Sequence, residues 1–253
     1  MPPRSRSTRS RSRSRTRAEI PTPNSDATVY PAPVAPTVPS AHPLRPRFFH
    51  LILLLLIGPL AVKRELQDPL TFFNVLNVLI CYWELLLIPC LPRIQGSYEE
   101  LKRSPQAPLA HVVSLFLHPL PPNPFSPLLH CKIWSHYSLY DPSYSDQFSF
   151  GFWIDAGNGL STVIPTVIMI AERFGVFGDE WARFLGFFIG MSYWQMLYGT
   201  LVYFTTFFFN RRHKDHKISD IIMFVAFANG LWIFGPILGI GRCWSWVETG
   251  SFI

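Results

Sequence analysis

Long apolar blocks constrain the fold of this chain more than any other feature of its sequence. Four of the five blocks reach the ~20 residues that a helix needs to cross a hydrocarbon core of ~30 Å. The first block is shorter, and it can span if flanking residues snorkel or the bilayer thins locally. The expected spans are 48–62, 70–91, 148–171, 184–209 and 220–240. The sequence therefore predicts an all-α integral membrane bundle of about five transmembrane helices.

The composition excludes an ordinary soluble domain. Hydrophobic residues make up 49% of the 253 residues and charged residues only 15%, and the charges cluster between the apolar blocks. A soluble domain would need charged surface throughout. The four Cys residues lack metal-ligand spacing, so we interpret them as packing residues and expect neither a metal site nor a cofactor.

The N-terminal region, residues 1–46, differs from the rest of the chain. Its first 17 residues hold seven Arg and no acid, so the net charge of +6 becomes −1 without them. The Arg/Ser alternation and the Pro-rich stretch that follows predict a disordered tail before a transmembrane domain at 47–253. RNA binding and phosphorylation-controlled interaction are alternatives, but a solvated tail that helps to fix orientation is favoured, and nucleic acid is not expected as a partner.

The loop charges agree with a cytosolic tail. If the tail is cytosolic by the positive-inside rule, five spans place the connections 92–147 and 210–219 in the cytosol too. These loops carry Arg93, Lys102, Arg103 and Lys132, and Arg211, Arg212, Lys214 and Lys217. Residues 110–120 are apolar but short and lie between Pro-containing stretches. We expect them to form an interfacial or re-entrant piece.

Glu84 and Asp155 are the two acidic residues that fall within the expected spans. A carboxylate in a span costs on the order of 2.5–3.5 kcal/mol on insertion scales, so it indicates a partner, a cavity or a function. Glu84 lies seven residues before the end of its block and Asp155 seven after the start of the next. At about 1.5 Å per residue, both lie about 10 Å below the same membrane face. The sequence predicts that they share a working site.

Polar residues at helical spacing extend this site to three blocks. They are Asp155, Asn158 and Thr162 in the third block, Gln195 and Tyr198 in the fourth, and Asn229 and Trp232 in the fifth. Residues at i, i+3 and i+7 share a helix face, which predicts a common polar interior. Hydrogen bonding between helices is the alternative for Thr162 and Tyr198, and plain packing is the alternative for Trp232.

Three motifs accompany these residues. In the fifth block, FANGLWIFGPIL fits the pattern N-A-L-W-x-x-x-P at Asn229, Leu231, Trp232 and Pro236. In the fourth block, MSYWQMLYGTLVYFTT fits S-x-G-Q-x-Y-G-D-x-L-Y-x-x-T at Tyr198, Gly199, Tyr203 and Thr206. Ahead of the third block, WSHYSLYDPSY fits W-x-x-Y-x-x-x-D-x-x-Y at Trp134, Tyr137, Asp141 and Tyr144. Together they resemble the emopamil-binding protein family, the sterol Δ8–Δ7 isomerases of the EXPERA group of five-span membrane proteins. The resemblance covers about 70–91 and 134–240.

The resemblance also identifies departures. Counting on from Tyr144 without a gap, the catalytic Glu of the family falls on Asp155. The His-x-x-x-Glu pattern of the first family span matches Glu84, but Ile80 stands in the place of the His. Gln195 is displaced by one residue, Thr200 stands where the family has Asp, and residues 92–133 have no counterpart.

The resemblance implies an isomerase that shifts a ring double bond in a sterol or related isoprenoid in the endoplasmic reticulum. Glu84 and Asp155 would be the acid and base, since two carboxyls in one apolar pocket allow one to stay protonated while the other is charged. The expected substrate-binding residues, from the helical spacing and the resemblance together, are Trp232, Asn229, Asn158, Gln195, Tyr198 and Thr162.

Two rival functions stay open, a non-catalytic sterol- or lipid-binding protein of the same fold and a membrane-bound terpene cyclase. The expected partners are a sterol or other polycyclic lipid, the lipid bilayer and a second copy of the chain in a homodimer.

Overall fold

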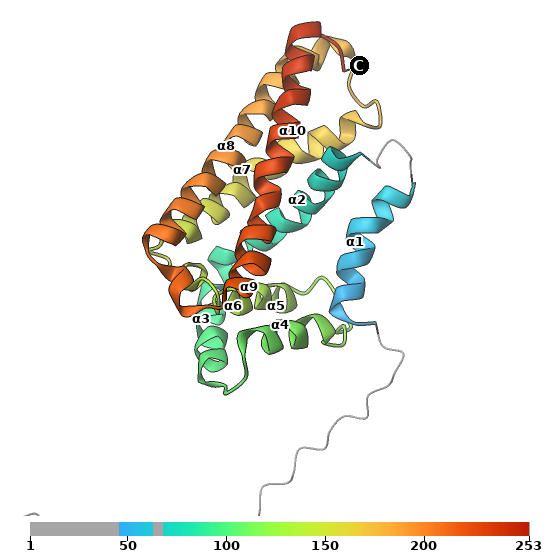
Figure 1. Ribbon diagram of the computed structural model, residues 1–253. Helices are drawn as coiled ribbons and strands as arrows, with labels where there is room; N and C mark the ends of the chain where they lie inside the picture. The colour runs from blue at the N-terminus through green and yellow to red at the C-terminus, as the bar shows by residue number, and fades with distance from the viewer. Residues whose placement is uncertain (1–45, 63–67, 253) are drawn as a thin grey trace, which may run out of the picture. The chain divides into compact units, whose positions relative to one another are not determined.

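The computed structural model describes residues 46–62 and 68–252, and within these ranges it is helical and contains no β-strand (Figure 1). The all-α prediction is confirmed for this part of the chain. Residues 1–45 of the predicted tail lie outside the described residues.

Helices occupy all the apolar blocks. They are α1 (Phe48–Val62), α2 (Pro69–Leu85), α7 (Phe150–Glu172), α8 (Ala182–Phe209) and a continuous helix formed by α9 (Ile218–Asp220), the π-helical η5 (Ile221–Phe227) and α10 (Ala228–Thr249). By length and composition, α7 and the continuous helix Ile218–Thr249 can cross a membrane, and α2 with α3 can be a third, bent span. This is fewer than the five spans predicted, because α1 and α2 have only 15 and 17 residues and α8 is rich in Tyr, Trp, Gln and Thr.

A sharp bend ends the second block earlier than predicted. The chain turns by 71° between α2 and α3 (Leu87–Arg103). Pro89 explains the break, because a proline has no N–H to bond back to residue 85 and its ring collides with that carbonyl. The bend leaves Glu84 in the last turn of α2. In the same turn, the Trp83 carbonyl accepts a 2.6 Å hydrogen bond from the Trp134 indole.

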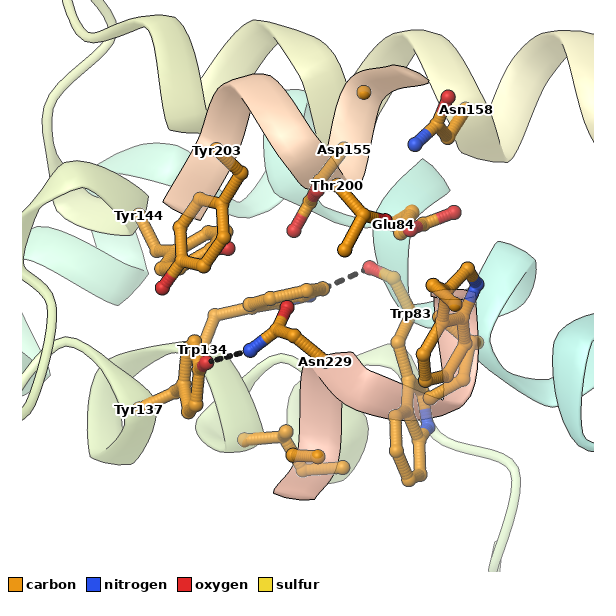
Figure 2. Close-up of a pocket in the computed structure, with 15 residues that line it drawn as sticks. Trp83, Glu84, Trp134, Tyr137, Tyr144, Asp155, Asn158, Thr200, Tyr203 and Asn229 are labelled. Atoms are coloured by element: carbon orange, nitrogen blue, oxygen red, sulfur yellow. Dashed lines mark hydrogen bonds between the residues drawn. The ribbon is translucent and has the colours of Figure 1, made fainter. Parts of the chain in front are cut away.

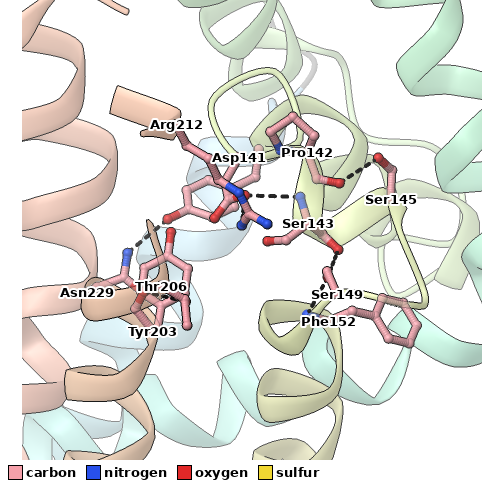
Figure 3. Close-up of polar contacts among 11 residues, drawn as sticks. Asp141, Pro142, Ser143, Ser145, Ser149, Phe152, Tyr203, Thr206, Arg212 and Asn229 are labelled. Atoms are coloured by element: carbon pink, nitrogen blue, oxygen red, sulfur yellow. Dashed lines mark hydrogen bonds and ion pairs between the residues drawn. The ribbon is translucent and has the colours of Figure 1, made fainter. Parts of the chain in front are cut away.

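The connection after α3 is a folded layer. It contains α4 (Pro108–Leu117), α5 (Pro127–His130), α6 (Lys132–Tyr137) and η2 (Pro142–Ser145), and α6 and η2 contact α3 and each other. The predicted interfacial piece at 110–120 is largely α4. Buried Asp141 caps η2 through the Ser143 N–H and forms a 2.7 Å ion pair with Arg212, which follows α8 (Figure 3). This ion pair fastens the connection to the helical bundle.

Two close helix pairs build the bundle, α2 with α7 and α8 with α10. Gly159 permits the first, since a Cβ there would lie 2.7 Å from the Cβ of Glu84 and 3.1 Å from the Cys81 carbonyl oxygen. Such distances are too short for any larger residue, so glycine lets the two backbones meet at Glu84.

Asp68 and Arg173 fasten the opposite end of the α2–α7 pair. Asp68 caps α2 by accepting hydrogen bonds from the Leu70 and Thr71 N–H groups, and it lies 2.6 Å from the Arg173 guanidinium. Burial alone would raise the pKa of Asp68, but the hydrogen bonds from Thr71 and Arg173 outweigh it and hold the pKa below its usual value. The Asp68 carboxylate therefore has a structural role, as the cap of α2 and as the ion-pair partner of Arg173.

Candidate functional site

Glu84 and Asp155 line the same pocket, which has a volume of about 190 Å³ (Figure 2). Residues from α2, α6, η2, α7, α8 and α10 surround it, so each long helix of the two close pairs contributes. The lining residues are Ile80, Trp83, Glu84, Ile133, Trp134, Tyr137, Tyr144, Asp155, Asn158, Gly199, Thr200, Tyr203, Ala228, Asn229 and Trp232.

Neither of the two carboxyls has an ion-pair partner among the described residues. Glu84 is 4% exposed, and its Oε2 atom has no hydrogen-bond partner among the described residues. Asp155 is half-buried and lies near enough to Glu84 for the two carboxyls to interact electrostatically. No Lys, Arg or His lines the pocket. A buried acid without a counter-charge, such as Glu84, is expensive to keep, which is typical of a group held ready for a ligand or a proton, whereas Asp155 has a hydrogen bond from Tyr144.

Aromatic side chains form nearly half of the remaining wall. Tyr144 stacks on Trp134 with ring centroids 5.0 Å apart, and Tyr137 lies 4.9 Å from Tyr144. Trp83, Trp232 and Tyr203 also line the pocket, so six aromatic side chains surround it. The faces of such rings carry negative potential and attract a cation.

Hydrogen bonds hold the polar wall residues in place. The Asn229 amide donates to the Tyr137 hydroxyl at 2.8 Å and to the Val225 carbonyl at 2.8 Å. The Trp232 indole N–H donates to Asn77 at 3.0 Å. Gln195 donates to the Asn158 side-chain oxygen at 3.0 Å. These hydrogen bonds restrict the rotation of the polar side chains that surround the two carboxyls, so the wall of the site is preorganised.

The structure brings together five of the eight residues predicted for the site. Glu84, Asp155, Asn158, Asn229 and Trp232 line the pocket. The other three lie elsewhere.

Gln195 does not line the pocket but orients Asn158, which does. Thr162 is buried between α2 and α7, where its hydroxyl contacts the Cys81 thiol at 3.3 Å. Tyr198 is 56% exposed and stacks on Trp194 on the outside of α8. The i, i+3 spacing of Gln195 and Tyr198 therefore did not identify the face of α8 that points into the pocket.

The aromatic wall was missing from the predicted site. Trp134, Tyr137 and Tyr144 come from the connection, outside every apolar block, and α6 and η2 fold them under the bundle. Their signal was the W-x-x-Y-x-x-x-D-x-x-Y spacing, which also contains Asp141. Tyr203 points towards Asp141 and Arg212 (Figure 3), and its hydroxyl lies close enough to the side chains of Asp141 and Tyr137 to interact with both.

Metal binding has no support in the part of the chain that the structure describes, where no group of three or more His, Cys, Asp or Glu side chains is placed to hold an ion. The chemistry available in the pocket is that of two carboxyls, amides, hydroxyls and aromatic rings.

Comparisons with protein-family models, with curated proteins and with solved structures found no match for this chain.

Proposed function

We propose that this chain is a five-span EXPERA-type protein of the endoplasmic reticulum that shifts a ring double bond in a sterol or a related polycyclic isoprenoid. The observation that carries the proposal is the meeting of Glu84 and Asp155 in one aromatic pocket that no cation lines.

The five-span arrangement, with a cytosolic tail, is part of the proposal. The outward side chains of α8 support it, since Phe184, Phe187, Met191 and Trp194 are all 58–66% exposed. Large apolar side chains on an outer face suit contact with lipid. The shorter α1 and α2 can cross if the bilayer thins locally or flanking residues reach its surface.

The proposed reaction needs no cofactor. The protonated carboxyl donates its proton to one alkene carbon, and the double-bond electrons form the new C–H bond and leave a carbocation on the other carbon. The second carboxyl, as carboxylate, removes a proton from a neighbouring carbon, whose C–H electrons form the shifted double bond. No electrons are gained or lost, and a proton must return to the first acid before the next turnover.

The pocket walls suit this intermediate. A carbocation would lie among aromatic faces, where cation–π attraction and the carboxylate both stabilise it. The volume of about 190 Å³ is smaller than the ~300–1,000 Å³ of typical ligand pockets, so only part of a polycyclic lipid would enter and the rest would stay in the bilayer.

A non-catalytic lipid-binding protein is the second candidate. Ile80 lines the pocket where the resembled family carries His, so no imidazole is at hand to pass protons. Ile80 in place of His favours a protein that binds the lipid without converting it.

Turnover of a Δ8-sterol by the purified protein, or rescue of an isomerase-deficient cell, tests the proposal. Wild type should convert Δ8- to Δ7-sterol, and Glu84→Gln and Asp155→Asn should each lose at least about 100-fold in rate. The control is Glu172→Gln, which removes an acid at the end of α7 outside the pocket and should stay active. Equal sterol binding by all four proteins without turnover on any sterol would replace the isomerase with the binding protein.

A further inference from the structure

A second pocket, of about 500 Å³, lies in the connection layer, apart from Glu84 and Asp155. Arg93 and Ser97 reach it from one face of α3, His118 follows α4, Ser126 precedes α5 and Lys132 begins α6. Its other lining residues are proline and leucine. Three basic side chains and two hydroxyls therefore converge from four segments.

The cations of this pocket are not neutralised. No acid lines it, and neither Arg93 nor Lys132 has an ion pair within the described ranges. Both line this one pocket, and both act electrostatically on the neighbouring Cys131 thiol. Lys102 on the same helix behaves differently, since it lies 3.5 Å from Glu99. Unpaired cations that face a common space attract an anion.

An exposed apolar stripe leads to this pocket. Leu109, Val113 and Leu117 are 43–46% exposed and follow i, i+4, i+8 spacing along α4, which ends beside His118. Leu128, which lines the pocket, is 50% exposed. A helix with one exposed apolar face next to basic residues is typical of a segment lying in a membrane interface.

We propose that this pocket binds the headgroup phosphate of an anionic phospholipid, whose acyl chains lie along the α4 stripe. Arg93 offers a planar pair of N–H donors to the phosphate oxygens, Lys132 offers a compact charge, and Ser97 and Ser126 offer hydroxyl donors. A free phosphate would use the same donors but would gain nothing from the exposed leucines. The apolar stripe therefore favours the lipid.

Lipid retention by the purified full-length protein in detergent, measured by native mass spectrometry, tests this site. We expect phosphatidic acid to be retained in preference to phosphatidylcholine. Arg93→Gln/Lys132→Gln should weaken phosphatidic acid binding about tenfold or more. The matched control, Lys102→Gln/Arg103→Gln, removes the same charge from α3 outside the pocket and should bind as wild type does.

Three results would overturn the proposal. Equal loss in the two double variants would mean a diffuse basic surface, and equal retention of both lipids would mean no headgroup site. Displacement of the lipid by inorganic phosphate at similar concentration would identify a soluble ligand. Should the neutral variant fail to fold, Lys132→Gln alone removes one charge and should weaken phosphatidic acid binding about threefold or more; wild-type binding by this folded variant would also contradict the site. None of these outcomes depends on sterol turnover.

Discussion

The two ends of the α2–α7 pair carry acids in opposite circumstances. At one end Asp68 caps α2 and is paired with Arg173 at 2.6 Å. At the other end Glu84 and Asp155 face a pocket without any cation, and one oxygen of Glu84 has no hydrogen-bond partner within the described part of the chain. The same two helices supply both ends.

Helix electrostatics deepen the contrast. Asp68 lies at the N-terminus of α2 and Arg173 at the C-terminus of α7, where the helix dipoles favour a negative and a positive charge respectively. Glu84 lies in the last turn of α2, where the dipole opposes a negative charge. The paired end contributes to stability, whereas the other end leaves two carboxyls without a counter-charge among the described residues.

Giving the unpaired end a cation should break this contrast most strongly. Ile80 lies one turn before Glu84 and lines the pocket, so Ile80→Lys would place an ammonium beside that carboxyl. We expect sterol turnover to fall at least about 100-fold while the thermal unfolding midpoint changes little, because the carboxylate would be held in an ion pair. Ile80→Met, which keeps an apolar side chain, should remain active. Unchanged turnover in Ile80→Lys would count against Glu84 as a reacting group.

Removing the cation from a buried paired acid should mainly affect stability. Asp141 is fully buried, so Arg212→Gln would leave its charge without a partner and should lower the free energy of unfolding by about 3 kcal/mol, as measured by chemical unfolding in detergent. Arg211→Gln is the control, because Arg211 is exposed and has no ion pair among the described residues. Equal losses from both variants would contradict a structural role for the Asp141–Arg212 pair.

The smallest effect is expected at the paired end. Asp68→Asn keeps a good N-cap but loses the ion pair, so it should cost about 1 kcal/mol near neutral pH. Folding lowers the pKa of Asp68, so its contribution is present above the usual carboxyl pKa and is lost as the pH falls through the folded value. The stability gap between wild type and variant should therefore close below about pH 4. A gap that persists there would show that Asp68 acts through its shape instead of its charge.

The sequence contained the helices and the facing acids. Apolar blocks predict helices because a membrane leaves the backbone no other local way to satisfy its hydrogen bonds. Counting 1.5 Å per residue placed Glu84 and Asp155 at one depth by assuming that the second helix runs to residue 91, whereas α2 ends at Leu85; both residues nevertheless line one pocket. The position of a residue along a helix can be counted from the sequence alone, whereas the point at which this helix ends is set by the bend at Pro89.

The direction in which each side chain of α8 points, and the aromatic wall of the pocket, could not be predicted from the sequence because both depend on tertiary contacts. α8 has apolar residues all round, so its sequence gave no indication that Tyr198 points outward. The Trp134 side chain is held at the pocket by a hydrogen bond from its indole to the Trp83 carbonyl, 51 positions away in the sequence. No local pattern predicts such a long-range contact.

The Trp232–Asn77 hydrogen bond also bears on biosynthesis. It joins the second helix of the bundle to the last across 155 positions, and with Asn229 it completes the pocket wall. While the ribosome is still making α10, the pocket has no far wall and cannot hold a ligand. A ligand that binds there would therefore stabilise only chains that have been synthesised to the end of the bundle, so its supply could influence how many finished molecules escape degradation.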